Sequence, residues 1–315
     1  MTMFQQTSSY LFRDQVGAIR RWRGRRQSSN VEDRRGQPLS AGSGGGGAAL
    51  LLLRVVPWLL RSKTGRVLLL VGAVGYVGAR LLGIDVLSMG QGSMTAERGQ
   101  PLSAEQQELA EFSAVVLAET EDTWRRIFAG MGKQYREPTL VLFSNGVRSA
   151  CGTASSAVGP FYCPGDQQLY LDLTFFNELR RRHGAPGDFA QAYVIAHEVG
   201  HHVQTLLGIS QRVRQAQSGL SQADANALSV RQELQADCFA GVWGHDAGQK
   251  QLLEEGDLEE ALTAANAIGD DTLQKQAGRA AVPDSFTHGS SAQRIKWFRR
   301  GFDSGDISAC DTFAG

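Results

Sequence analysis

The sequence predicts a mostly helical α+β domain with a small edge sheet, preceded by one transmembrane helix. Three features of the 315-residue chain support this fold class. Long helical patterns follow residue 103, two short strand-like runs lie among them, and an apolar run covers residues 67–87. A region of roughly 210 residues, 103–315, is large enough to bury one substantial core as a single domain.

The overall net charge of zero conceals a strong asymmetry along the chain. Residues 1–66 contain 12 Lys/Arg and 3 Asp/Glu, a net charge of +9, whereas the remainder contains 20 and 29, a net charge of −9. We interpret residues 1–66 as a basic, disordered cytoplasmic tail. The tail lacks interleaved aromatic residues and any nucleic-acid motif, so anionic lipid is the expected partner and nucleic acid is not.

The apolar run at 67–87 has the length of a membrane span if Arg80 reaches the interface. The basic residues before it predict a signal-anchor, with the N-terminus in the cytoplasm and the C-terminal domain outside it, inserted in the inner membrane. The alternative is that this run, or a shorter one at 48–60, is a core helix. Residues 88–102 are interpreted as a linker.

The domain is expected to begin with a helix at 103–132, because Ser103 and Gln106 have the spacing of a capping box. Residues 138–143 and 168–173 have strand-like patterns. The second strand comes shortly before the helix described next, where an edge strand could hold an extended peptide through main-chain hydrogen bonds. A purely structural strand is the alternative.

The strongest chemical signal is the run H-E-V-G-H at residues 197–201. His197 and His201 are one helical turn apart, so both imidazoles can bind a single Zn²⁺. Glu198 lies on the neighbouring part of that face, where it can act as a general base toward a zinc-bound water. A solvated histidine pair on an ordinary helix is the alternative.

The helix that carries this motif is expected to begin after Asp188 as its N-cap and to end before Gly208. Val194, Ile195, Val199 and Val203 supply apolar contacts on both sides. Gly200 costs a helix about 1 kcal/mol relative to alanine, so we expect a close neighbour there. His202 points about 100° away from His201 and is not expected to bind the ion.

A second long helix, predicted from Ser221 to Asp246, supplies the remaining acidic residues. Glu233 and Asp237 lie one turn apart, and we interpret Glu233 as the third zinc ligand and Asp237 as the acceptor of a ligand histidine's second N–H. A solvated acidic face is the alternative. His183 and His245 are weaker candidates for the third ligand, because both fall in expected loops.

The four cysteines all lie beyond residue 87 and are even in number, as expected of an exported domain. We expect Cys151 to pair with Cys163 across a short loop, and Cys238 to pair with Cys310 at the C-terminal end. Three connectivities are open from the sequence, and zinc binding by thiolates is the alternative.

These residues resemble those of the gluzincins, the thermolysin-like metallopeptidases, and the run E-L-Q-A-D resembles that of the membrane-embedded CAAX-type and heat-shock proteases. Such proteases also have a later T-H-P segment followed by an arginine; here Gly289 replaces the proline. The resemblance implies that His288 donates a hydrogen bond to the oxyanion. Arg294 is a weaker match, because the basic residues around it are also typical of a solvated helix face.

A more extensive resemblance covers the chain from Arg21 onward. The blocks R-W-R-G-R-R-Q-S-S-N, C-G-T-A-S-S-A-V-G-P-F-Y-C-P, E-L-Q-A-D-C-F-A-G-V-W and D-S-F-T-H-G-S-S-A-Q-R resemble the YpfJ-like bacterial neutral zinc metallopeptidases. The resemblance implies a zincin-like, membrane-anchored zinc metallopeptidase that acts on peptide or protein substrates.

The sequence therefore predicts one of three functions. The first is a zinc-dependent endopeptidase with one catalytic ion. The second is a membrane-tethered interaction protein with a structural, non-catalytic zinc site, which a fourth protein ligand would favour. The third is an esterase or amidase that acts on cell-wall material with the same ion.

Overall fold

Side-chain caps begin the two longest helices of the computed structural model, which describes residues 20–37, 102–183 and 187–314. The Ser103 hydroxyl accepts a hydrogen bond from the Gln106 amide, and the Gln106 side chain accepts one from Ser103 N–H. This confirms the predicted capping box at the start of α5 (Ala104–Gly130). Ser221 caps α9 (Gln222–Gln249) in the same position.

Helix α7 (Asp188–Leu206) carries the H-E-V-G-H motif and begins one residue earlier than predicted. Its N-cap is Gly187, so the assignment of Asp188 as N-cap is wrong. A Cβ at Gly187 would lie 1.5 Å from a Glu260 oxygen, so the chain enters the helix through a residue without a side chain. Gly208 follows the helix in the left-handed region at φ 72°, as the sequence predicts.

Shorter elements complete the described part of the chain. They are η1 (Arg20–Trp22), β1 (Val31–Asp33), β2 (Thr139–Phe143), β3 (Gly146–Ser149), β4 (Gly152–Ser155), η2 (Ser156–Val158), β5 (Phe161–Cys163), β6 (Gln168–Asp172), α6 (Thr174–His183), α8 (Ile209–Gln217), α10 (Asp257–Ala267), α11 (Asp270–Gln276), η3 (Pro283–Ser285), α12 (Ser291–Ser304) and η4 (Ile307–Cys310). The fold is therefore mostly helical with a small sheet, as predicted.

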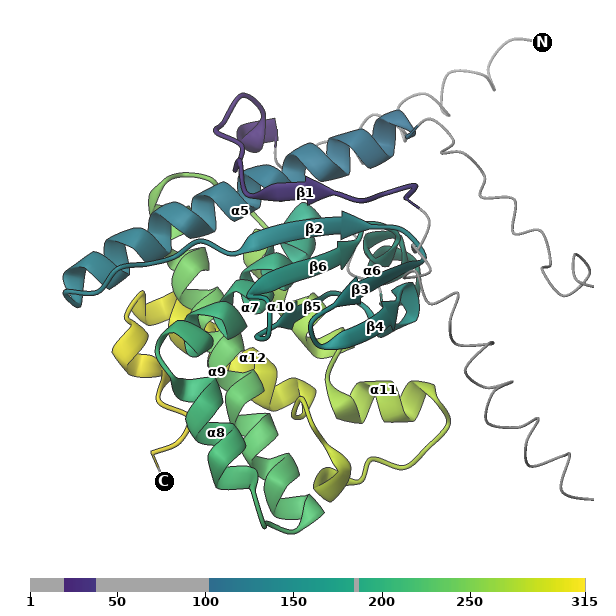
Figure 1. Cartoon of the computed structure of the whole chain (residues 1–315), viewed down its shortest axis with the longest axis vertical. Coiled ribbons are helices and arrows are strands. Elements are labelled where there is room, and N and C mark those ends of the chain that lie inside the picture. The colour runs from purple at the N-terminus through teal and green to yellow at the C-terminus, as the bar shows by residue number, and fades with distance from the viewer. Residues whose placement is uncertain (1–19, 38–101, 184–186, 315) are drawn as a thin grey trace, which may run out of the picture. The chain divides into compact units, whose positions relative to one another are not determined.

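The main sheet has the strand order β1-β2-β6-β5 (Figure 1). Strands β1, β2 and β6 are parallel, and β5 runs antiparallel to β6. Strands β3 and β4 form a separate hairpin. The two predicted strands are β2 and β6, but β6 is an inner strand, so its assignment as the edge strand is wrong. The edge strands are β1 and β5, and β5, which lies next to β6, is too short to give a periodic sequence pattern.

The helical core forms around α7, which packs against both α9 and the sheet. The four apolar residues predicted to bury this helix are at most 5% exposed. Gly200 lies against Ala236 of α9: a Cβ at Gly200 would be 3.1 Å from the Ala236 Cα atom. This confirms the expected close neighbour, since a larger residue at position 200 would push the two helices apart.

The N-terminal segment 20–35 is part of this domain, so the assignment of these residues to a disordered tail is wrong. Residues 20–35 and 102–314 belong to one compact unit, in which β1 forms a parallel ladder with β2. Trp22 is buried and packs edge-on against Phe112, with ring centroids 5.6 Å apart. The basic composition of the segment hid this role, although Arg23, Arg25 and Arg26 pair with acidic residues of α5.

The buried carboxylate of Glu121 on α5 depends on the same segment. Its side chain is 1% exposed and accepts hydrogen bonds from Ser28 Oγ at 2.5 Å and Asn30 Nδ2 at 2.9 Å. Arg26 adds an ion pair at 3.0 Å. A buried carboxylate without partners is costly, so these contacts attach residues 26–30 to α5.

None of the helices in the described residues is both long and apolar enough to cross a bilayer. The predicted span at 67–87 lies outside the described residues, as does the linker apart from Leu102. The strand pairing nevertheless limits the topology. Because Val31–Asp33 is hydrogen-bonded to Leu140–Leu142, both lie on the same side of any membrane. A single crossing between them, as predicted, is incompatible with this pairing.

His202 joins α7 to the sheet on the side away from the other two histidines. Its Nε2 donates to the Arg136 carbonyl at 2.6 Å, and its Nδ1 accepts from the Tyr162 hydroxyl at 3.1 Å. The side chain is completely buried. Burial lowers the pKa of His202 to about 4, so the neutral imidazole is the form that fits the fold.

Replacing Ser28 by alanine should lower the free energy of unfolding of the full chain by about 1–3 kcal/mol, because Glu121 loses a buried hydrogen bond. Chemical denaturation measures this change. The matched control is Ser29→Ala, since Ser29 is exposed. Equal stabilities of the two variants would contradict the structural role of the segment.

Acidification should destabilise the domain partly through His202. The pKa of His202 in the folded state lies below its ordinary value. The contribution of the neutral imidazole to the free energy of unfolding is therefore fully present above pH about 6.5 and decreases as the pH falls toward about 4. The loss attributable to this residue is roughly 3 kcal/mol at most. His202→Gln should show a shallower loss over that interval in denaturation experiments at several pH values; identical slopes would exclude this contribution.

Candidate metal centre

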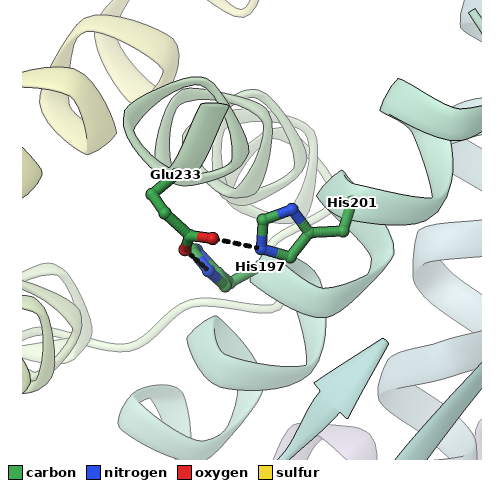
Figure 2. Close-up of side chains that lie close together, drawn as sticks. All are labelled: His197, His201 and Glu233. Carbon is green, nitrogen blue, oxygen red and sulfur yellow. Dashed lines mark hydrogen bonds and ion pairs between the residues drawn. The ribbon is translucent and has the colours of Figure 1, made fainter. Parts of the chain in front are cut away.

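Helices α7 and α9 bring three metal-ligating side chains together (Figure 2). His197 Nε2 lies 3.2 Å from Glu233 Oε2, and His201 Nε2 lies 3.4 Å from Glu233 Oε1. One ligand atom from each of the three residues can be chosen so that all lie within 4.8 Å of one another. The three residues predicted as zinc ligands therefore share one site, and in the described part of the chain no other such group is found.

The donor set fits a zinc ion. Two imidazole nitrogens and one carboxylate are common ligands of catalytic zinc, with the fourth position open to water. Ligand atoms about 2.1 Å from a tetrahedral centre are roughly 3.4 Å apart, close to the 3.2 and 3.4 Å separations here. The side chains are also largely buried, so the site can compete with water for the ion.

The outer nitrogen of His197 is held by a buried carboxylate. Asp237 is 0% exposed, and its Oδ1 accepts from His197 Nδ1 at 2.8 Å and from the Tyr193 hydroxyl at 2.5 Å. The bond from Nδ1 leaves the Nε2 lone pair free to face Glu233. The structure thus places Asp237 where the sequence analysis expected it, behind a ligand histidine.

Arg294 compensates the charge of Asp237 from α12. Its Nε and Nη2 atoms donate to the two Asp237 oxygens, each at 2.9 Å. Burial raises the pKa of Asp237, but Arg294 and His197 lower it by a larger amount, so that the pKa is about 2. The solvated-face interpretation of Arg294 is wrong, since its side chain is 2% exposed. Arginines 299 and 300 on the same helix are exposed, which explains the misleading basic pattern.

The outer nitrogen of His201 is held by an amide. Gln204 Oε1 lies 3.0 Å from His201 Nδ1, and the Gln204 side chain is completely buried. Gln204 was not among the site residues predicted from the sequence. Its position three residues after His201, on the same helical face, was an available signal.

The site carries an excess of negative charge that a cation can balance. Burial lowers the pKa of His197, but Asp237 and Glu233 raise it more, to about 10. Burial likewise raises the pKa of Glu233, whereas His201 and His197 lower it well below its usual range. Two carboxylates thus favour positive charge at the two imidazoles, and a bound divalent ion would supply that charge in place of protons.

A cleft of about 460 Å³ opens onto these three side chains. Glu198 lines it next to the ligands and is partly exposed, as a base that must reach a water molecule should be. Apolar side chains form much of its wall, namely Val158, Pro160, Phe161, Phe175, Ile268 and Leu273. Edge strand β5 therefore borders the same space as the metal ligands.

His288 lies across this cleft, on the loop before α12. Asp270 fixes the loop: its Oδ2 accepts from the backbone N–H groups of Thr287, His288 and Gly289 at 2.7, 2.7 and 3.0 Å. The Asp270 Oδ1 atom lies 3.3 Å from His288 Nδ1 and raises the pKa of His288. The imidazole is thereby held at the cleft with its other nitrogen free of this contact.

The other histidines considered for the metal have different surroundings. His245 lies on α9, 12 residues beyond Glu233 and about 18 Å along the helix, and contacts the Phe302 carbonyl at 2.7 Å. The prediction that His183 and His245 fall in loops is wrong, because both residues belong to helices. His183 ends α6, and its side chain lies outside the described residues. His202 binds the Arg136 carbonyl and Tyr162, as expected of a residue outside the ligand set.

Both expected disulfides are present. Cys151–Cys163 joins the β3–β4 hairpin to β5 at the cleft, and Cys238–Cys310 joins α9 to the C-terminal segment. No cysteine is free, so thiolate zinc binding is excluded. The first bridge thus attaches the hairpin to β5, which lines the cleft. The second attaches the C-terminal segment to α9, which carries Glu233.

Comparison with known proteins agrees with this geometry. Residues 20–313 match the family described as "Putative neutral zinc metallopeptidase". The Escherichia coli "Uncharacterized protein YpfJ" is 53% identical over 297 residues, which cover 93% of this chain and 98% of the relative. The Mycobacterium bovis "Uncharacterized protein Mb2605" is 45% identical over 202 residues, covering 61% of this chain and 66% of the relative.

No solved structure matches the chain significantly. The family match includes the N-terminal segment from residue 20, in agreement with its place in the domain. It also includes both helices of the candidate centre and the loop with His288. The chain therefore belongs to the neutral zinc metallopeptidase family.

Proposed function

We propose that this protein is a zinc-dependent endopeptidase in which His197, His201 and Glu233 bind one catalytic ion. The observation that carries the proposal is the convergence of both imidazole Nε2 atoms on the Glu233 carboxylate, with Glu198 lining the same cleft. Zinc, when bound, polarises a water molecule and the scissile carbonyl group. The remaining chemistry is assigned to side chains of the chain.

Glu198 acts as the general base: it accepts the proton of the attacking water and passes it to the leaving amine. Its partial exposure in the cleft supports this role. His288 donates a hydrogen bond to the carbonyl oxygen as negative charge develops there, a role supported by the Asp270 contacts that hold its loop. Asp237 keeps His197 in the tautomer that leaves Nε2 unprotonated.

An extended peptide is the substrate that the cleft suits best. Strand β5 ends the main sheet, and Phe161 and Tyr162 on it line the cleft. An exposed strand edge can bind a peptide backbone by strand addition, while the apolar wall accepts apolar side chains. This favours a peptidase over the esterase or amidase considered from the sequence.

The alternative of a structural zinc site in an interaction protein requires a fourth protein ligand. The group found in the described residues has three members and adjoins an open cleft. This arrangement favours a catalytic ion with a water ligand. Measurement of zinc coordination in the purified protein distinguishes the two functions.

Replacement of Glu198 by glutamine should lower kcat by about 10²–10⁴-fold on a casein substrate, because the amide cannot accept a proton. Zinc content should equal that of the unchanged protein, since Glu198 is not a ligand. Glu259→Gln, at an exposed position on α10, is the matched control. Retained activity in zinc-loaded Glu198→Gln would exclude this mechanism.

We further propose that the domain is outside the cytoplasm and attached to a membrane through the apolar run at 67–87. The two disulfides support an oxidising compartment. The pairing of β1 with β2 requires residues 20–35 to lie on the same side of the membrane as the rest of the domain.

Single cysteines at exposed positions 29 and 299 test this topology, because all four native cysteines are in disulfides. In intact cells that express the full chain, a membrane-impermeant maleimide should label both Ser29→Cys and Arg299→Cys. Labelling of position 299 alone would restore the single crossing and contradict the β1–β2 pairing. Labelling of neither position before lysis would place the domain in the cytoplasm.

A further inference from the structure

The two ligand histidines are held by different chemistry, and the support of His201 extends through buried amides to the C-terminal segment. Gln204 Oε1 contacts His201 Nδ1 at 3.0 Å, while Gln204 Nε2 donates to Gln235 Oε1 at 3.1 Å. Gln235 Nε2 in turn donates to the Cys310 carbonyl at 3.0 Å. Both glutamine side chains are buried.

The direction of this amide chain is fixed by groups that can only accept. A backbone carbonyl cannot donate, so the Cys310 carbonyl requires the Gln235 nitrogen to face it and the Gln235 oxygen to face Gln204. The Gln232 carbonyl, 2.7 Å from Gln204 Nε2, imposes the same orientation on Gln204. If either amide were reversed, its oxygen would face a backbone carbonyl oxygen. Both side chains are buried, so water could not supply a replacement hydrogen bond.

The orientation of Gln204 determines the tautomer of the His201 imidazole. With its oxygen toward His201, Gln204 can only accept, so the proton of the neutral imidazole lies on Nδ1. The Nε2 lone pair is then directed to the side of Glu233, where the metal would bind. Unlike Asp237 behind His197, the amide achieves this without adding a second charge to the site.

We propose that Gln204 and Gln235 are positioning residues of the metal centre, forming an amide chain through which the C-terminal segment fixes the tautomer and orientation of His201. The inference rests on the proposed zinc site. The amide chain ends at the Cys310 carbonyl, and the Cys238–Cys310 disulfide attaches this residue to α9, the helix that also carries Glu233. One helix thus presents the third ligand and supports the second.

The test is the zinc affinity of the full chain, measured by competition with a chromophoric chelator. Gln204→Leu should bind zinc about 10–100-fold more weakly. Gln235→Leu should have a smaller effect, a few-fold, because Gln204 keeps its bond to the Gln232 carbonyl. The absorption spectrum of the Co²⁺-substituted protein should change in Gln204→Leu, since the geometry of one ligand is altered.

Gln217→Leu is the matched control. Its side chain joins α8 to α9 by contacts with the Ala225 carbonyl and Ser229 Oγ, both at 2.9 Å, but does not contact the metal ligands. Zinc affinity and the Co²⁺ spectrum should be unchanged in this variant. Equal losses in Gln204→Leu and Gln217→Leu would show general destabilisation and overturn the inference.

A double-mutant cycle separates positioning from loss of fold. In a His201→Ala background, Gln204→Leu should weaken zinc binding by less than twofold, because the group it positions has been removed. An undiminished penalty there, or no penalty in the unchanged background, overturns the inference. Failure of the unchanged protein to bind zinc would instead refute the proposed function itself.

Discussion

The close approach of α7 and α9 is the constraint on which the candidate site depends. Gly200, between the two histidines, lies against Ala236, and a Cβ at Gly200 would be 3.0 Å from the Ala236 carbonyl oxygen. The missing side chain lets the two helix backbones approach until short imidazole and carboxylate side chains reach one point. The helix loses about 1 kcal/mol of intrinsic propensity at this glycine.

Buried polar groups then determine how each side chain points. Asp237 is fully buried and would be costly if unpaired, but Arg294, Tyr193 and His197 all donate to it. These contacts join α7, α9 and α12 around one carboxylate. The charges around the candidate ligands thus depend on contacts between segments that are far apart in the sequence.

The periphery of the domain is fixed by segments far away in sequence. The N-terminal segment completes the sheet at β1 and pairs the buried Glu121. At the other side of the sheet, the Cys151–Cys163 disulfide holds the hairpin against β5, the strand that borders the cleft. These attachments give the short sheet a defined edge beside the candidate centre, which a three-residue strand could not maintain by itself.

The sequence by itself determined the helix with His197, Glu198 and His201 and the acidic pair on the next long helix, because ligand spacing and helical period are local properties. Only the tertiary structure decided that β5 forms the edge strand and that Arg294 and Gln235 are buried behind the ligands. Those assignments depend on contacts between segments separated by tens of residues, such as Arg294 with Asp237. A basic helix face and a buried ion pair have the same local pattern, and only the packing of α12 on α9 distinguishes them.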